Sequence, residues 1–446
     1  MGKLFGTDGI RGIVGEDLTG KLAMNVGESS AYVLGDNSSM NVVVGRDTRI
    51  SGQMLSSALS AGLMSQGANV IDLGVVPTPA VSYLVKKYGC NMGAMISASH
   101  NPSEYNGIKL FNSEGFKLPD EVENEIEKYL FGKAIPSSSN IGKEVLAKKA
   151  IDDYVDYIIS TSEYINPDLK IIVDCAYGSA SETAPLLFKK LGLNAEIINS
   201  KYNGYNINDN AGSTHLEGLI EKVKSSNADV GIAYDGDADR CLMIDENGNI
   251  VDGDQIMAIS SLYLKNRGML TNNTLVGTVM SNLGLVKFCD ANDIDFEKTK
   301  VGDRYVLEKM LEKDYIIGGE QSGHVIYKNH ANTGDGELTS IQVLNIMSKE
   351  NKSLSGLASV MKKYPQVLVN IDVNDVGKEK YKDDSSVIDV ISKVEHELGD
   401  DGRILVRASG TENLIRVMIE GLDEEDITKK ANDVAFVIKK KYGMKK

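Results

Sequence analysis

The stretch Val230-Gly-Ile-Ala-Tyr-Asp-Gly-Asp-Ala-Asp-Arg-Cys-Leu-Met-Ile244 predicts two short buried strands on either side of an acidic loop. The loop places Asp235, Asp237 and Asp239 at every second position and ends at Arg240. Neighbouring carboxylates raise each other's pKa, so the loop favours a hard divalent cation, which prefers oxygen ligands. An arginine beside such a cation is expected to face an anion. The stretch therefore predicts a metal site for phosphate chemistry.

This loop has two other interpretations. It could be a solvated acidic turn, or the calcium loop of an EF-hand, which needs Asp at its first, third and fifth positions and Glu at its twelfth. Asp235, Asp237, Asp239 and Glu246 meet that spacing. The sixth position should be Gly but is Arg240, and the flanks predict strands rather than helices. An EF-hand is therefore disfavoured.

Composition restricts the class of protein. The chain has 446 residues with 42% hydrophobic and 25% charged residues, which is typical of a globular protein of about three domains. A net charge of −15 argues against a general nucleic-acid or membrane binder. The start of the chain does not resemble a signal peptide, and no apolar run is long enough to span a bilayer. The widely spaced Cys90, Cys175, Cys241 and Cys289 are expected to be buried free thiols, so we expect a cytoplasmic protein.

Three segments share a strand–helix–strand–helix–strand pattern, which predicts α/β domains with mixed, mostly parallel sheets. The predicted strands are 41–45, 68–72 and 92–96, then 170–174, 195–198 and 229–234, then 274–279, 295–299 and 315–317. The predicted helices are 53–66, 80–88, 183–191, 216–225, 283–291 and 305–312. After residue 366 the pattern of predicted elements changes. Strands are predicted at 367–373 and 402–406 and a helix at 424–442, which indicates a smaller α+β domain. We therefore expect four domains, at residues 1–150, 151–253, 254–366 and 367–446, with the ligand-binding edges of the first three meeting at a central cleft.

A polar loop follows the last predicted strand of each segment, where open α/β sheets bind ligands. The first loop carries Ser97 and Ser99, and spacing alone does not say which serine would carry a phosphoryl group. The second is the acidic loop. In the third, Glu320, Ser322 and His324 alternate, so an extended loop would point all three toward sugar hydroxyls. Lys109 could transfer a proton if neighbouring cations lowered its pKa.

The last candidate loop, residues 407–416, has the composition of a phosphate cradle. Ser409 and Thr411 offer hydroxyl groups, Gly410 lets backbone N–H groups turn toward an anion, and an arginine stands at each end. A hairpin turn flanked by arginines is the structural alternative.

Taken together, these motifs resemble the α-D-phosphohexomutase superfamily. The stretches that carry the resemblance are 5–12, 96–102, 235–240, 319–324 and 407–416, in the family's order along the whole chain. Within the superfamily the chain looks like the bacterial phosphoglucosamine mutases, on the evidence of 301–306, Gln321 and 333–336. Ala408 and Asn413 depart from residues common among relatives, and we expect this to alter the stiffness of the loop rather than its chemistry.

The resemblance implies an intramolecular phosphotransferase of the isomerase class that interconverts glucosamine 6-phosphate and glucosamine 1-phosphate, for UDP-N-acetylglucosamine and cell-wall synthesis. The reaction would run through a phosphoserine enzyme and a bisphosphorylated sugar. The alternatives are phosphomannomutase/phosphoglucomutase activity, a metal-dependent phosphatase with a serine nucleophile, and a calcium-binding module.

The resemblance also implies roles for particular residues. The implied catalytic residues are Ser99 as the phosphoserine, His100, Lys109, Arg11, Arg240 and His324. The implied ligands of one Mg²⁺ per subunit are Asp235, Asp237, Asp239 and the phosphate on Ser99. The implied substrate-binding residues are Glu320, Ser322, Arg407, Ser409, Gly410, Thr411 and Arg416. A sugar 1,6-bisphosphate would be the phosphorylating activator. No nucleic acid or membrane is expected as a partner, and a homodimer and an activating kinase or autophosphorylation are left open.

Overall fold

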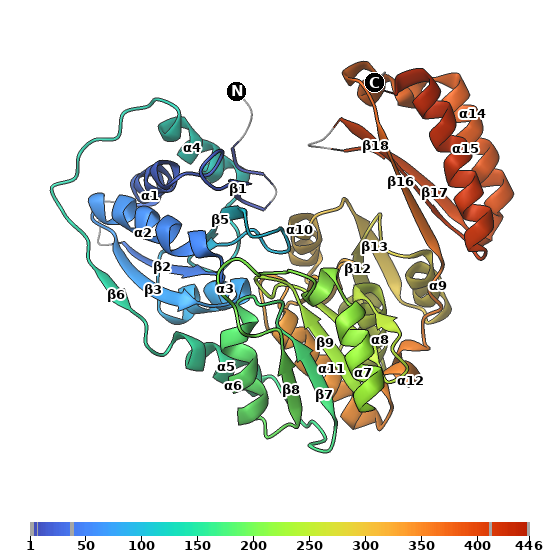
Figure 1. Cartoon of the computed structure of the whole chain (residues 1–446), viewed down its shortest axis with the longest axis horizontal. Coiled ribbons are helices and arrows are strands. Elements are labelled where there is room, and N and C mark those ends of the chain that lie inside the picture. The colour runs from blue at the N-terminus through green and yellow to red at the C-terminus, as the bar shows by residue number, and fades with distance from the viewer. Residues whose placement is uncertain (1–3, 7, 36–39, 410–412, 444–446) are drawn as a thin grey trace. The chain divides into compact units, whose positions relative to one another are not determined.

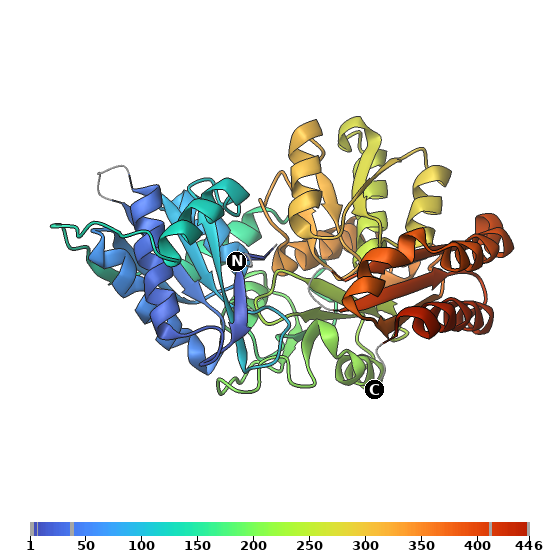
Figure 2. The same ribbon diagram turned by 90° about the horizontal axis from the view of Figure 1, so that it is seen from above.

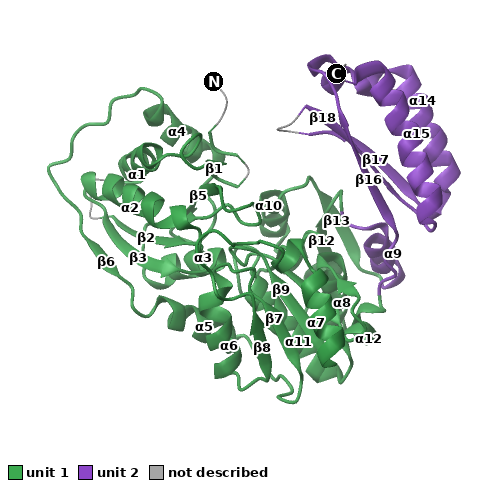
Figure 3. Ribbon diagram, in the orientation of Figure 1, with its two compact units in different colours: residues 1–280, 293–360 green, residues 281–292, 361–446 purple. Residues whose placement is uncertain are grey.

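Figure 1 shows the computed structural model, which describes residues 4–6, 8–35, 40–409 and 413–443. The contacts within the chain define two compact units. The first contains Met1–Met280 and Asp293–Val360, and the second contains Ser281–Asn292 and Met361–Lys446 (Figure 3). The first unit holds three α/β sheets, and the second holds a smaller antiparallel sheet with helices. The prediction of α/β domains with mixed, mostly parallel sheets and a smaller C-terminal α+β domain is therefore confirmed.

The first α/β domain is built on a six-stranded sheet in the order β1-β5-β4-β2-β3-β6. Its strands are β1 (Ile10–Ile13), β2 (Asn41–Arg46), β3 (Asn69–Val75), β4 (Met92–Ile96), β5 (Tyr105–Asn112) and β6 (Glu144–Leu146). Its helices are α1 (Gly20–Leu34), α2 (Ile50–Ser65), α3 (Thr78–Lys87) and α4 (Asp120–Leu130). Figure 2 shows α1 and α2 lying together beside this sheet. Every residue of the central strand β4 is buried, as its continuous apolar run predicts.

The second α/β domain has a five-stranded sheet in the order β11-β10-β9-β7-β8. Its strands are β7 (Ile171–Asp174), β8 (Ala195–Ile198), β9 (Val230–Tyr234), β10 (Cys241–Asp245) and β11 (Ile250–Val251). Its helices are α5 (Ala150–Ser160), α6 (Ala180–Lys190), the 3₁₀ turn η1 (Gly212–Thr214) and α7 (Glu217–Ser226). Strands β9 and β10 are buried at every residue, as the apolar runs on both sides of the acidic loop predict.

The third α/β domain has a four-stranded sheet in the order β13-β12-β14-β15. Its strands are β12 (Thr274–Thr278), β13 (Asp295–Thr299), β14 (Ile317–Gly319) and β15 (Val325–Tyr327). The helices along this part of the chain are α8 (Gly253–Asn266), η2 (Thr271–Asn273), α9 (Leu283–Ala291), α10 (Asp303–Lys313), α11 (Gly336–Glu350) and α12 (Leu354–Ala358). Helix α9 has the predicted bounds, but it belongs to the second compact unit (Figure 3).

The second unit has an antiparallel sheet in the order β16-β18-β17. Its strands are β16 (Gln366–Asp372), β17 (Arg403–Ala408) and β18 (Leu414–Glu420). Besides α9, its helices are α13 (Asp375–Lys380), η3 (Tyr381–Asp383), α14 (Ser385–Leu398), η4 (Gly399–Asp401) and α15 (Glu424–Tyr442). Buried residues of the sheet and of α14 and α15 form one apolar core, so this unit has a core of its own.

Each candidate loop of the first unit is the turn of a β-hairpin. A strand that pairs in parallel with its neighbour enters the loop, and an antiparallel strand leaves it: β4 and β5, β9 and β10, β14 and β15. The sequence patterns did not predict β5 or β15, because β5 contains Asn106-Gly107 and β15 has three residues. The hairpins place all three loops at the carboxyl ends of buried parallel strands.

Two expectations from composition were tested by the structure. All four cysteines are buried and unpaired, as predicted. Among the described residues, no helix combines the length and the apolar character needed to cross a bilayer.

Candidate active site

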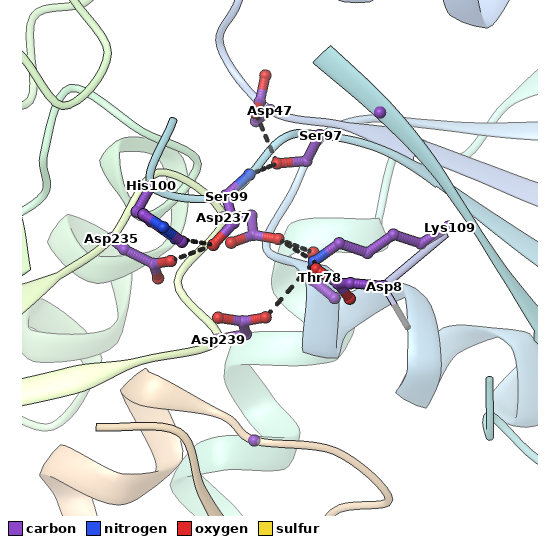
Figure 4. A network of polar contacts seen from close by, with 12 residues as sticks. Asp8, Asp47, Thr78, Ser97, Ser99, His100, Lys109, Asp235, Asp237 and Asp239 are labelled. Carbon is purple, nitrogen blue, oxygen red and sulfur yellow. Dashed lines mark hydrogen bonds and ion pairs between the residues drawn. The ribbon is translucent and has the colours of Figure 1, made fainter. Parts of the chain in front are cut away.

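The loops that follow β4, β9 and β14 lie together in the first unit. The Ser99 hydroxyl donates a hydrogen bond to Asp235 Oδ2 at 2.6 Å, which links the first loop to the second (Figure 4). His324 Nδ1 lies 3.7 Å from Asp239 Oδ2, which links the third loop to the second. The structure thus brings a serine, three carboxylates and a histidine from three α/β domains into one site.

Ser99 has a strained backbone and a buried side chain. Its φ of 53° lies in the left-handed region, which non-glycine residues adopt at a cost, and the residue is 1% exposed. Besides its bond to Asp235, its Oγ lies 3.4 Å from His100 Nδ1. Ser97 instead donates its hydroxyl to Asp47 at 2.7 Å and accepts the Ser99 backbone N–H at 2.9 Å. Ser99 therefore faces the acidic loop, whereas Ser97 supports the turn.

A buried arginine holds the serine loop in this conformation. The Arg49 guanidinium donates to the backbone carbonyl groups of Ser99 at 2.9 Å and Asn101 at 2.7 Å. It also donates to the carbonyl groups of Pro102 and Tyr105, and its Nε donates to Asp47 Oδ2 at 2.9 Å. The side chains of Arg49 and Asp47 are fully buried. This ion pair fixes the backbone of the loop without using the Ser99 hydroxyl.

We predict that Arg49→Met destabilises the protein by roughly 3–5 kcal/mol, because it leaves the buried Asp47 carboxylate without its counter-charge. Chemical denaturation would measure the change in the free energy of unfolding. The matched control is Arg46→Met, three residues earlier, where the ion pair with Asp72 is partly exposed and a loss of about 1 kcal/mol is expected. Equal losses in the two variants would contradict the role given to Arg49.

The acidic loop has the donor set and the spacing of a cation site. Asp235, Asp237 and Asp239 are buried, and their nearest carboxylate oxygens lie within 4.8 Å of one another. Oδ1 of Asp237 and Oδ1 of Asp239 are buried and have no hydrogen-bond partner among the described residues. Burial and the charges of Asp239 and Asp237 raise the pKa of Asp235 well above its usual value. Three hard oxygen donors with partly unsatisfied atoms fit a divalent metal ion.

Glycine is required where the acidic loop passes the serine loop. A Cβ at Gly236 would lie 2.5 Å from the Ser99 carbonyl oxygen. The Asn208 side chain joins the same contact by donating to the Ser99 carbonyl at 2.9 Å. The close approach sets the distance between Ser99 and Asp235.

Lys109 lies among carboxylates, whose charges outweigh that of the neighbouring Arg11. Its Nζ lies 2.8 Å from Asp237, 3.2 Å from Asp8 and 3.5 Å from Asp239. Burial alone would lower the pKa of Lys109, but these three charges outweigh burial and raise it above the usual value. The condition for proton transfer by Lys109, a pKa lowered by neighbouring cations, is therefore not met, and the ammonium group is held in its charged form.

Arg240 and Arg11 bring positive charge to the side of Ser99 that carries His100. Burial and the charges of Arg240 and Arg11 lower the pKa of His100 to about 4, so its imidazole is neutral at physiological pH. The Nε atoms of both arginines are buried without a hydrogen-bond partner among the described residues. The Arg240 backbone N–H also donates to Asp235 at 3.2 Å. Two arginines whose charges act on His100, the neighbour of the Ser99 hydroxyl, supply guanidinium groups of the kind that bind phosphoryl oxygens.

The third loop is a tight turn, and not the extended loop that the sequence suggested. Gly323 N–H donates to the Glu320 carbonyl at 3.0 Å, and Glu320 N–H to the His324 carbonyl at 3.0 Å. The Glu320 carboxylate accepts the Gly302 N–H at 2.9 Å, while the His324 ring faces the acidic loop. The buried Ser322 hydroxyl has no hydrogen-bond partner in the described part of the chain. The side chains of Glu320, Ser322 and His324 therefore point in different directions. The Ser322 hydroxyl can still donate a hydrogen bond to a ligand.

The arginines of the last candidate loop lie side by side in the second unit. Arg407 in β17 and Arg416 in β18 are direct partners in an antiparallel ladder, so their side chains leave the same face. Partial burial and the charge of Arg416 lower the pKa of Arg407. Gly410 and Thr411 lie outside the described residues, and Ser409 directly follows β17. The described part of this stretch is thus an antiparallel pair of strands, and the like charges of its two arginines favour a bound anion.

Several residues of the site were not predicted from the sequence. They are Asp8, Asp47, Arg49, Thr78, Lys117, Asn208 and Asp303. Asp47 and Arg49 directly follow strand β2, so the rule that polar residues after a parallel strand line a site could have found them. Asp8 and Asp303 lie inside stretches that carry the family resemblance. Lys117 has no signal in the sequence.

Comparison with protein families gives four matches along the chain. Residues 2–134, 152–248 and 252–364 match the alpha/beta/alpha domains I, II and III of phosphoglucomutase/phosphomannomutase. Residues 368–436 match the C-terminal domain of the same family.

Individual relatives agree with these matches. Phosphoglucosamine mutase from Acetivibrio thermocellus is 50% identical over 449 aligned residues, which cover 99% of this chain and 100% of the relative. A phosphoglucomutase/phosphomannomutase family protein from Burkholderia thailandensis has a similar fold, with a TM-score of 0.83, 24% identity and coverage of 99% and 98%. N-acetylphosphoglucosamine mutase from Aspergillus fumigatus, solved with GlcNAc-6P and magnesium, has a TM-score of 0.71 at 18% identity, with coverage of 98% and 95%.

Proposed function

This chain belongs to the phosphoglucomutase/phosphomannomutase family, and from that premise we propose that it interconverts glucosamine 6-phosphate and glucosamine 1-phosphate. It is a phosphohexomutase, an isomerase that works by phosphoryl transfer. Half of its residues are identical to those of a phosphoglucosamine mutase along the full length of both chains, which supports the amino sugar over glucose or mannose phosphates. The product would feed the synthesis of UDP-N-acetylglucosamine.

The observation that carries the proposed mechanism is the 2.6 Å hydrogen bond between the Ser99 hydroxyl and Asp235. It joins the candidate phosphoryl carrier to the candidate metal loop in a buried site. In the proposed reaction the phosphate on Ser99 moves to the free O1 hydroxyl of glucosamine 6-phosphate, and the Ser99 P–O bond breaks. The 6-phosphate of the resulting bisphosphate then returns to Ser99 and leaves glucosamine 1-phosphate.

The positive groups around Ser99 suit this transfer. Arg240 and Arg11 are proposed to bind the phosphoryl oxygens, and the charged Lys109 to stabilise the negative charge that develops in the transition state. Neutral His100 lies 3.4 Å from Ser99 Oγ, within reach of the leaving oxygen, and His324 is proposed to take part in proton transfer.

Mg²⁺ is the proposed metal of the acidic loop. Asp235, Asp237 and Asp239 would hold the ion together with an oxygen of the phosphate on Ser99. When bound, the ion would neutralise charge on the transferring phosphoryl group.

The remaining candidates are proposed to bind the sugar phosphate. Glu320 and Ser322 would contact sugar hydroxyls. The 407–416 hairpin would hold the phosphate that does not react, with Arg407, Ser409, Gly410, Thr411 and Arg416 as its ligands. Because the substrate must bind in two orientations, this hairpin must accept a phosphate from either end of the sugar.

The cellular setting is part of the same proposal. The enzyme would act in the cytoplasm, where its four free cysteines stay reduced. A sugar 1,6-bisphosphate would phosphorylate Ser99, in addition to a kinase or autophosphorylation. The proposed assembly is a homodimer.

A coupled assay tests the function. We predict that kcat/KM for glucosamine 6-phosphate exceeds the values for glucose 6-phosphate and mannose 6-phosphate by at least about tenfold, since polar recognition can discriminate by more than that. Glucose 1,6-bisphosphate should raise the initial rate. Isomerisation of the glucose or mannose phosphates at an equal rate would favour phosphomannomutase/phosphoglucomutase activity. Release of inorganic phosphate without isomerisation would point to a phosphatase.

A further inference from the structure

Six side chains around the acidic loop form a closed circuit of contacts in which acidic and basic groups alternate. We call this circuit the charge ring. Its members, in order of contact, are Lys109, Asp8, Lys117, Asp303, His324 and Asp239, and the contact between Asp239 and Lys109 closes the circuit. Asp237 contacts Lys109 from outside the ring. The ring contains side chains from all three α/β domains.

Lys117 joins the two halves of the ring. Its Nζ lies 2.5 Å from Asp8 and 2.5 Å from Asp303. On one side, Asp8 contacts Lys109 and Arg11. On the other side, Asp303 lies 3.7 Å from His324 Nε2. Lys117 is therefore one residue removed from three of the proposed catalytic side chains.

The charge of Lys117 keeps two carboxylates from different domains close together. Burial raises the pKa of Asp303, and the charges of Lys117 and His324 lower it below the usual value, against the opposing charge of Asp8. Asp8 and Asp303 therefore repel each other directly. Without the ammonium group between them, this repulsion would push apart the segment before β1 and the start of α10.

The orientation of His324 depends on the same neighbourhood. Gly334 N–H lies 2.9 Å from His324 Nε2, and Nδ1 on the other side of the imidazole lies 3.7 Å from Asp239. Asp303 lies on the Nε2 side of the ring. A shift of Asp303 would therefore disturb the Nε2 edge of the His324 imidazole, which Gly334 contacts.

We propose that Lys117 and Asp303 are positioning residues for phosphoryl transfer, which act through Asp8 on Lys109 and Arg11 and through contact with His324. The proposal rests on the proposed mutase function. In a preorganised site a small displacement of a catalytic group lowers turnover strongly. The effect should fall on kcat, because neither residue belongs to the groups proposed to bind the substrate.

A second ion pair between the first and third α/β domains provides a control. It separates the positioning of catalytic side chains from the mere attachment of one domain to the other. Arg304 in α10 pairs with Asp120 at the start of α4, one residue from Asp303 and three from Lys117. This ion pair joins the first and third α/β domains as the Lys117–Asp303 pair does, but it is more exposed and lies outside the charge ring. If the ion pairs only hold the domains together, the loss of either pair should have a similar effect.

The experiment compares kcat and KM for glucosamine 6-phosphate in the wild type, Lys117→Met, Lys117→Arg, Asp303→Asn and Arg304→Met. Methionine suits position 117 because this side chain lines a cavity of about 290 Å³ that accommodates an uncharged chain of similar length. We expect kcat to fall roughly tenfold or more in Lys117→Met, with KM within about twofold. Lys117→Arg should recover most of the loss, Asp303→Asn should resemble Lys117→Met, and Arg304→Met should stay within about twofold of the wild type.

Thermal unfolding of each variant decides how its kinetics are interpreted. If Lys117→Met does not fold, Asp303→Asn, which keeps the shape of the side chain, decides by the same criterion. Unchanged kcat in the folded variants, or an equal loss in Arg304→Met, would overturn the proposal. Lack of mutase activity in the wild type would instead overturn the proposed function, so the two failures are distinguishable.

Discussion

Ser99→Ala is expected to lower mutase activity by at least about three orders of magnitude, to background, because the substitution removes the oxygen that would carry the phosphoryl group. The fold should survive. The contacts that hold this loop use the Ser99 backbone, since Arg49 and Asn208 bind its carbonyl group and Ser97 accepts its N–H. The substitution removes one hydrogen bond to Asp235, which costs about 1–3 kcal/mol at most. Activity on glucosamine 6-phosphate and thermal unfolding measure the two effects.

Ser97→Ala is the matched control, because it removes a neighbouring hydroxyl from the same loop. This variant loses the hydrogen bonds to Asp47 and to the Ser99 N–H, so we expect lower stability and reduced but measurable turnover. Intact mass after incubation with glucose 1,6-bisphosphate should show one phosphate on Ser97→Ala and none on Ser99→Ala. The opposite pattern would assign the phosphoryl group to Ser97.

The sequence predicted elements best where burial produces a simple pattern. Strand β4 and helices α9 and α15 have the predicted bounds, because apolar runs and a long amphipathic repeat leave little choice. Helix α1 (Gly20–Leu34) was not predicted, since it contains two glycines and two adjacent serines. Strands β5 and β15 were missed for a related reason: their pairing with β4 and β14 comes from tertiary structure and not from local propensity.

The candidate site was predictable where one loop carries several functional groups. The acidic loop shows its chemistry in its own spacing. The direction of the pKa shift of Lys109 could not be predicted, because the carboxylates that raise its pKa come from a segment near the N-terminus and from another domain. Lys117 and Asp303 are 186 residues apart, and only folding brings them into contact. Pairwise charge relations of this kind depend on tertiary distances, which a single sequence does not contain.

Asp237→Asn is expected to abolish most of the effect of Mg²⁺ on the activity and the melting temperature of the enzyme. Asp237 Oδ2 accepts hydrogen bonds from Thr78 at 2.6 Å and Lys109 at 2.8 Å. In the variant the amide oxygen must take this position, because both neighbours are donors and the amide NH₂ cannot accept their hydrogen bonds. The NH₂ group then replaces Oδ1, the buried oxygen without a partner, and a metal ion does not bind to an amide nitrogen of this kind.

Loss of this ligand should raise the Mg²⁺ concentration for half-maximal activity by roughly 10- to 100-fold and lower turnover at saturating Mg²⁺ by about 100-fold. Mg²⁺ should raise the melting temperature of the wild type, since a ligand that binds the folded state stabilises it, and should do so much less in the variant. The control is Asp168→Asn, an exposed carboxylate of the same α/β domain, which should behave as the wild type does. An Asp237→Asn variant with unchanged activity and thermal titrations would exclude the acidic loop as the metal site. A variant that loses activity but keeps the thermal response would mean that Asp237 acts through Lys109, because its charge would then serve to orient the ammonium group and not to bind the ion.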